Sequence, residues 1–139
     1  MIEFIYKTLA SLGFTHPLHP VTAHVVMGMI MGGFLFKLAS YKWKDMSKTA
    51  DHCYIMALIF TPLTIILGLM DWAHRFSGVM NNLIVAKFVL AGAFTLLLSV
   101  LVYFKYKGNV GNKIIFTLYV LCLLAATGLG FVGGELVFG

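Results

Sequence analysis

Long apolar stretches alternate with short polar links along this chain. Four stretches are long enough to cross a membrane, since a span needs about 20 residues. They cover 20–41, 49–72, 82–104 and 113–136. Backbone polar groups in lipid must be paired within their own segment, so these stretches are predicted to be helices. The links YKWKDMSK, HRFSGVMNN and KYKGNVGN are short and force neighbouring helices to run antiparallel. The pattern predicts an all-α, integral membrane, up-down four-helix bundle.

The first fifteen residues carry a different pattern. Apolar side chains recur at helical spacing, with charges between them: Ile2, Ile5, Leu9 and Leu12, with Glu3 and Lys7 interspersed. The stretch is too short to span, and it lacks the basic start and cleavage site of a signal peptide. We therefore predict two parts, a short N-terminal interfacial helix in 1–15 and a transmembrane domain in 16–139. A disordered first segment is the alternative.

Composition supports a membrane location. The 139 residues are 60% hydrophobic and only 11% charged, whereas soluble domains carry about 25% charged residues. The net charge of +5 is therefore interpreted as a sign of orientation, and no nucleic-acid partner is expected. Cys53 and Cys122 lie in apolar stretches without CxxC spacing, which favours small buried side chains over a disulfide or a zinc site.

The lysines predict how the bundle is oriented. We call the end that holds His24 the histidine end and the opposite end the lysine end. Seven lysines fall at or near the lysine end: Lys37, Lys42, Lys44, Lys48, Lys105, Lys107 and Lys113. The histidine end has only Lys7, Arg75 and Lys87. By the positive-inside rule, the lysine-rich links are cytoplasmic and the histidine end faces outward from a bacterial inner membrane.

Four of the five histidines fall at the histidine end. His16, His19 and His24 occur in THPLHPVTAH, and His74 occurs in DWAHR where the second span returns. Imidazole is a common ligand of metals and of haem iron. His24 and His74 lie on adjacent helices and form the preferred ligand pair, with His19 as the substitute for either. His52 stands alone at the lysine end and is predicted to be an interfacial side chain.

The neighbours of these histidines leave two readings open. Gly28 and Gly32 follow His24 at intervals of four, which opens a flat slot for either a porphyrin or a neighbouring helix. Asp71 lies three residues before His74 and would orient that ring through its second nitrogen. In the alternative, Asp71 pairs with Arg75 at a solvated helix end.

Charged side chains in the other two spans point to the same end. Lys87 lies near the start of the third span, and Glu135 lies near the end of the fourth. Charges inside spans are costly and are functional hypotheses by default. With His24 and Asp71 they predict a polar site to which all four helices contribute. The fourth span also carries four glycines, which predict a close backbone approach, a cofactor edge or a helix break: Gly128, Gly130, Gly133 and Gly134. Pro62 predicts a kink in the second span.

Three segments also carry a family resemblance. The start LHPVTAHVVMG, the middle GLMDWAH and the end TGLGFVGGELVFG resemble a family of bacterial membrane proteins classed as a domain of unknown function, numbered 2231. The resemblance covers His16 to Gly139. It implies a four-helix membrane domain, found alone or beside redox modules. Relatives often have a histidine near the start of the third span, where this chain has Met80, Asn81 and Asn82.

These observations support three hypotheses on function. In the first, His24 and His74 are the axial ligands of a b-type haem that lies against Gly28. Arg75 and Lys87 neutralise the haem propionates, and electrons pass to a quinone or a redox partner protein. The second is a non-catalytic anchor or scaffold subunit of a larger complex or oligomer, surrounded by membrane lipid. The third is a copper or zinc site formed by the histidines of the histidine end. No recognisable nucleophile motif or phosphate-binding loop is present.

Overall fold

The structure, a computed structural model, describes residues 2–75, 77–108 and 110–138, and helices joined by turns and short loops are the only regular elements in these ranges. The elements in chain order are α1 (Ile2–Ser11), α2 (His19–Ala39), α3 (Met46–Arg75), α4 (Asn82–Lys107) and α5 (Asn112–Phe138). Four of them, α2 to α5, are long and apolar enough to cross a membrane. The predicted all-α architecture with four spans and a short N-terminal helix is confirmed.

The helices extend past the apolar stretches that predicted them. α3 begins at Met46 and ends at Arg75, a total of 30 residues, because helical hydrogen bonding continues into the polar ends of a span. Pro62 lies inside α3 without breaking it. The preceding Thr61 is buried, and its hydroxyl donates to the carbonyl of Ala57 at 2.7 Å. The Thr61 hydroxyl thus finds its acceptor within its own helix, as a buried polar group in a span must.

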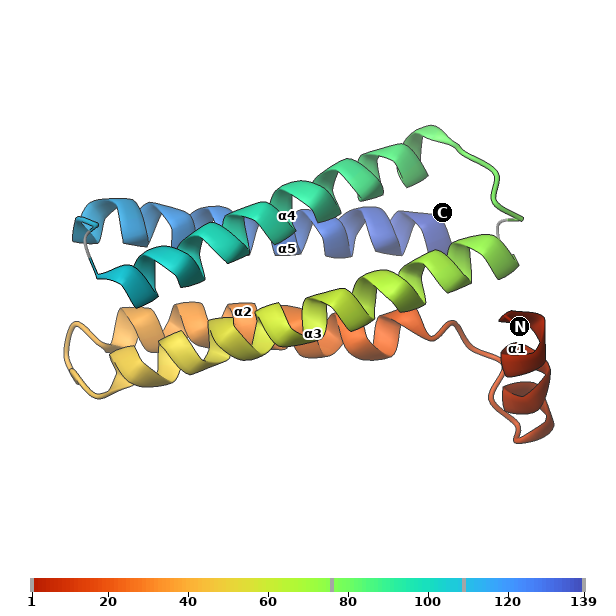
Figure 1. The fold of residues 1–139 in the computed structure, drawn as a ribbon, viewed down its shortest axis with the longest axis horizontal. Helices are drawn as coiled ribbons and strands as arrows, with labels where there is room; N and C mark the ends of the chain where they lie inside the picture. Colours follow the sequence, from red (N-terminus) through yellow and green to blue (C-terminus); the bar gives the residue numbers. More distant parts are fainter. Residues whose placement is uncertain (1, 76, 109, 139) are drawn as a thin grey trace.

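The four long helices form two hairpins that lie side by side (Figure 1). α2 packs most extensively on α3, and α4 packs most extensively on α5. The short connections alternate between the two ends of the bundle, which is the up-down order that the links predicted. The histidine end therefore holds the starts of α2 and α4 and the ends of α3 and α5.

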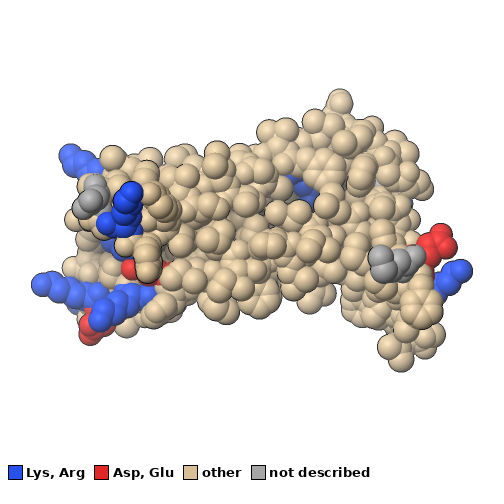
Figure 2. Space-filling model, in the orientation of Figure 1, with Lys and Arg blue, Asp and Glu red and all other residues tan. Residues whose placement is uncertain are grey.

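Charged side chains are concentrated at the two ends of the bundle. Figure 2 shows lysine, arginine and acidic side chains at both ends, with an almost uninterrupted uncharged surface between them. Many large apolar residues are exposed along this middle part, among them Leu35, Ile59 and Leu96, each more than 60% accessible. An uncharged belt between two charged ends is the surface expected of a protein surrounded by lipid.

Local signals fix the ends of α4. The Asn81 side chain caps its first turn by accepting from the backbone N–H of Ile84 at 2.8 Å. Gly108 ends the helix with a φ of 73°, a left-handed conformation that glycine adopts without strain. Both residue types are common helix boundaries, so the sequence places α4 closely.

The core near the lysine end is built on two tyrosines. Tyr54 of α3 and Tyr119 of α5 are 2% and 0% accessible, and their rings meet edge to face with centroids 4.6 Å apart. The Tyr54 hydroxyl donates to the carbonyl of Ile30 in α2 at 3.3 Å. Gly33 of α2 lies directly against the Tyr54 ring. Together these contacts join α2, α3 and α5 at one level of the bundle.

The short helix α1 lies at the histidine end, across the axis of the bundle in Figure 1. Ile2, Tyr6 and Leu9 are partly buried, and α1 contacts α3. Ile5 and Leu12, which the sequence placed on the same apolar face, are instead exposed. The face that packs is therefore the one centred on Tyr6, because Tyr6 finds a polar partner on α3.

Candidate functional site

Asp71 is the centre of the polar contacts at the histidine end. It lies in the last turns of α3 and is 6% accessible. Its carboxylate accepts from the backbone N–H groups of His19 at 2.7 Å and of Leu18 at 3.1 Å, and from the hydroxyl of Tyr6. The first N–H groups of a helix have no partner within it, and Leu18 offers no side-chain cap. Asp71 therefore caps α2 from another helix.

Tyr6 binds the end of α3 in two ways. Its ring stacks on His74, with centroids 4.0 Å apart and planes 6° from parallel. Burial and the adjoining Asp71 carboxylate raise the pKa of the Tyr6 phenol above its ordinary value, so this group stays protonated and donates at physiological pH. The connection between α1 and α2 is held to the end of α3 as well, because Arg75 donates to the carbonyl of Thr15.

His19 interlocks α2 with α3. Its Nδ1 lies 3.0 Å from the carbonyl oxygen of Thr64. A Cβ on Gly68 would lie only 2.9 Å from the same nitrogen, so a glycine is needed where the imidazole crosses α3. Gly68 and Asp71 are the first and fourth residues of GLMD. Both serve the start of α2, which explains why this motif and the HP entry occur together in one fold.

Asp71 thus has partners that the sequence did not predict. The proposed contact to His74 and the alternative pairing with Arg75 both rested on helical spacing. In the described residues Asp71 instead binds Tyr6, Leu18 and His19, so both expectations were wrong. The backbone N–H groups at the start of α2 need an acceptor more than the side chains of His74 and Arg75 do, because those side chains are exposed and can bind water.

His24 differs from His19 in its surroundings. Its side chain is exposed, and its Nδ1 is hydrogen-bonded to the carbonyl of Pro20 one turn earlier. Nothing lies within 4 Å of where a Cβ on Gly28 or Gly32 would be. The slot that the sequence predicted below His24 is therefore open, and at Gly28 it lies on the exposed surface of α2.

The remaining candidates lie in separate places. Lys87 is partly buried and close enough to Asp71 and His19 for its charge to act on both. Its Nζ lies 3.9 Å from where a Cβ on Gly133 would be. Glu135 is exposed. In the described residues neither Lys87 nor Glu135 makes a hydrogen bond or an ion pair with Asp71, so the predicted convergence of four polar groups is not seen at contact distance.

The other two histidines, His16 and His52, are exposed. His16 meets Phe14 edge to face at 6.1 Å, and His52 is exposed at the lysine end. Within residues 2–75, 77–108 and 110–138, no three or more His, Cys, Asp or Glu side chains are grouped as a metal site.

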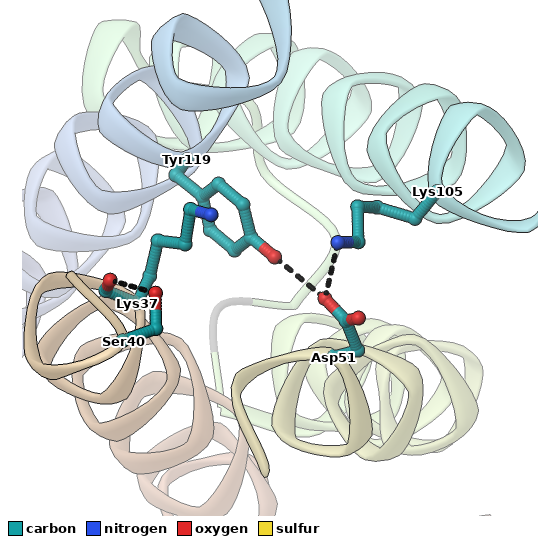
Figure 3. A network of polar contacts seen from close by, with 5 residues as sticks. All are labelled: Lys37, Ser40, Asp51, Lys105 and Tyr119. Atoms are coloured by element: carbon teal, nitrogen blue, oxygen red, sulfur yellow. Dashed lines mark hydrogen bonds and ion pairs between the residues drawn. The ribbon is translucent and has the colours of Figure 1, made fainter. Parts of the chain in front are cut away.

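A second polar cluster, at the lysine end, was missed by the sequence analysis. Asp51 of α3 accepts from the Tyr119 hydroxyl at 2.8 Å and pairs with the Lys105 ammonium at 3.1 Å (Figure 3). The Lys37 ammonium lies 5.8 Å from the centre of the Tyr119 ring. A carboxylate inside an apolar stretch is the signal that could have revealed it. The two carboxylates that link helices, Asp51 and Asp71, lie at opposite ends of α3.

The fold and these contacts define a multi-pass helical membrane protein. Residues 15–139 match the family described as predicted membrane protein (DUF2231), and the chain belongs to that family. This confirms the resemblance inferred from the three motifs. The matched region contains His19, Gly68 and Asp71, whereas Tyr6 lies before it. Comparison with curated proteins and with solved structures gave no match.

Proposed function

We propose that this chain is a membrane-embedded electron-transfer subunit that binds a b-type haem at the histidine end. The observation that carries the proposal is the environment of His24. A ligating histidine usually has one ring nitrogen fixed by a carbonyl or carboxylate while the other binds the metal. His24 has this arrangement, since Nδ1 is held by the Pro20 carbonyl and the side chain is exposed beside an open glycine slot.

His74 is the proposed second ligand. Its side chain is exposed at the end of α3, and the stacked Tyr6 ring restricts its orientation. His19 is the weaker choice, because its imidazole already fills the contact between α2 and α3 beside Gly68. Arg75 and Lys87 supply positive charge at this end for the haem propionates. The glycine slot lies on the exposed surface of α2, away from the bundle core. A second copy of the chain could therefore supply one of the two haem ligands.

Optical spectroscopy on protein purified from haem-replete cells tests this proposal. We expect a sharp Soret band that shifts on reduction. His24→Ala and His74→Ala should each abolish the bis-histidine spectrum, whereas the matched control His52→Ala, at the lysine end, should retain it. Colourless wild-type protein would show that haem is not bound. A bis-histidine spectrum that survives in both variants would show that the ligands are wrongly assigned.

A specific observation favours a second candidate, a non-catalytic anchor or scaffold subunit. Tyr6, His19 and Asp71 are engaged in contacts that hold α1, α2 and α3 together and need no cofactor. This candidate predicts colourless protein that copurifies with other subunits. Metal analysis of the same sample tests the copper or zinc alternative.

The proposed function also needs an orientation, with the histidine end facing the periplasm, where a redox carrier or a quinone would exchange electrons. The lysine-rich connections would then be cytoplasmic. Single cysteines introduced as Leu12→Cys and Lys44→Cys, in a Cys53→Ala/Cys122→Ala background, test this arrangement. A membrane-impermeant maleimide should label the Leu12 position in intact spheroplasts and the Lys44 position only after the membrane is opened. The reverse pattern would place the histidine end inside.

A further inference from the structure

The lysine end contains a groove that the haem proposal does not use. A cavity of about 190 Å³ lies between α3, α4 and α5. Its lining residues are Asp51, Tyr54, Ile55, Leu101, Val102, Lys105, Tyr106 and Tyr119. Leu101 and Tyr119 are at most 1% accessible and form its floor, whereas Ile55 is 41% and Tyr106 95% accessible at its rim. The groove therefore opens sideways between α3 and α4, toward lipid.

The groove has an apolar part and a polar end. Ile55, Leu101 and Val102 line the part that lies deeper along the bundle, and Asp51 and Lys105 lie nearer the ends of their helices. In a membrane this polar end lies near the level of lipid headgroups. A ligand that satisfies both parts is amphiphilic.

Positive charge dominates around the polar end. Asp51 is the acidic residue of the lining, and it already accepts from Tyr119 and Lys105. A lysine ammonium has three donors, of which Asp51 takes one at Lys105, and the Lys105 side chain remains 27% exposed. Lys48 lies on the same face of α3 one turn nearer the helix start, and Lys37 lies across the Tyr119 ring. The excess of cations favours an anionic ligand.

We propose that this groove binds the phosphate group of an anionic membrane phospholipid. Lys105 is the principal phosphate ligand, and part of an acyl chain packs against Ile55 and Val102. The cavity holds about six groups of the size of water, at ~30 Å³ each. That is room for a headgroup fragment or a few carbons, so the rest of the lipid lies along the exposed surface. Basic pockets between membrane helices on the cytoplasmic side bind anionic headgroups in this way.

Lipid retention by the purified protein tests the proposal. The full chain in mild detergent is titrated with phosphatidylglycerol, or with phosphatidylcholine that has the same acyl chains, and the bound lipid is measured by native mass spectrometry. We expect preferential retention of phosphatidylglycerol. Lys105→Gln should weaken it about fivefold, the effect of one lysine near an anionic headgroup. The matched control Lys107→Gln should have little effect, because Lys107 lies on the Tyr103 hydroxyl outside the groove.

A variant with the opposite expected sign guards against a folding defect. Asp51→Asn retains an oxygen that can accept from Tyr119, but it releases Lys105 from its ion pair. It should therefore raise phosphatidylglycerol retention, which a partly unfolded protein would not do. Equal retention of the two lipids, or equal losses in Lys105→Gln and Lys107→Gln, would overturn the proposal. Displacement of phosphatidylglycerol by millimolar inorganic phosphate would identify a site for soluble anions and overturn the assignment to lipid.

Discussion

Asp71→Ala is expected to destabilise the protein by about 3 kcal/mol, because a buried donor left without an acceptor costs about 1–3 kcal/mol. The substitution leaves the N–H groups of Leu18 and His19 and the hydroxyl of Tyr6 without their shared acceptor. It also removes the cap of α2, an effect that costs about 1 kcal/mol at many helix starts. Thermal unfolding of the purified protein in detergent measures the loss.

The matched control for this prediction is Asp45→Ala. Asp45 is exposed just before the start of α3, so the same chemical change should cost at most the small contribution of one exposed carboxylate at a helix start and lower the melting temperature far less. Asp71→Asn should fall between the two, since its amide oxygen can accept only part of what the carboxylate accepts. Equal melting temperatures for Asp71→Ala and Asp45→Ala would mean that Asp71 does not cap α2.

The sequence predicted the spans well because lipid imposes a strong and simple constraint. Each crossing needs a long apolar run, and the short links leave little freedom in how neighbouring helices are ordered. The boundaries were less well predicted where polar residues continue a helix, as at Met46 and Arg75 of α3. Asn81 and Gly108, by contrast, mark the ends of α4 through local chemistry alone.

The contacts of the histidine end were predicted less well, because they join residues far apart in the chain. Helical spacing favoured His74 as the partner of Asp71, whereas the observed partner Tyr6 lies 65 residues earlier. One signal was available, since Leu18 cannot cap the helix that begins at His19 and an acceptor from elsewhere was therefore required. Asp51 was missed although its position inside an apolar stretch was visible in the sequence.

Gly33→Ala is expected to destabilise the contact between α2 and α3. The new Cβ would lie 2.5 Å from Cε2 of Tyr54 and 3.0 Å from Cβ of Cys53. The Tyr54 ring has little room to move, since it is buried against Tyr119 and its hydroxyl is bonded to Ile30. Overpacking of this kind typically costs about 1–3 kcal/mol. Thermal unfolding in detergent should show a clear fall in melting temperature.

Alanine substitutions at two other glycines distinguish the cost of overpacking from the gain in helix propensity. Gly28→Ala, in the same helix, meets nothing within 4 Å and should be neutral or stabilising, since alanine favours a helix over glycine by about 1 kcal/mol. Gly130→Ala would approach the end of the Met27 side chain, with its methyl at 2.6 Å and its sulfur at 3.4 Å, and this flexible side chain can withdraw at little cost. Among the three variants, Gly33→Ala should therefore have a melting temperature well below those of Gly28→Ala and Gly130→Ala.

A double-mutant cycle identifies the cause of the Gly33 effect. Tyr54→Leu removes the ring that a methyl group at position 33 would strike, so Gly33→Ala should cost much less in that background than in the wild type. The coupling energy between the two substitutions then measures the steric contact itself, because the loss of Tyr54 is common to both arms of the cycle. If Gly33→Ala were equally destabilising with and without Tyr54, the cost would arise from the α2 backbone and the proposed contact would not be its cause.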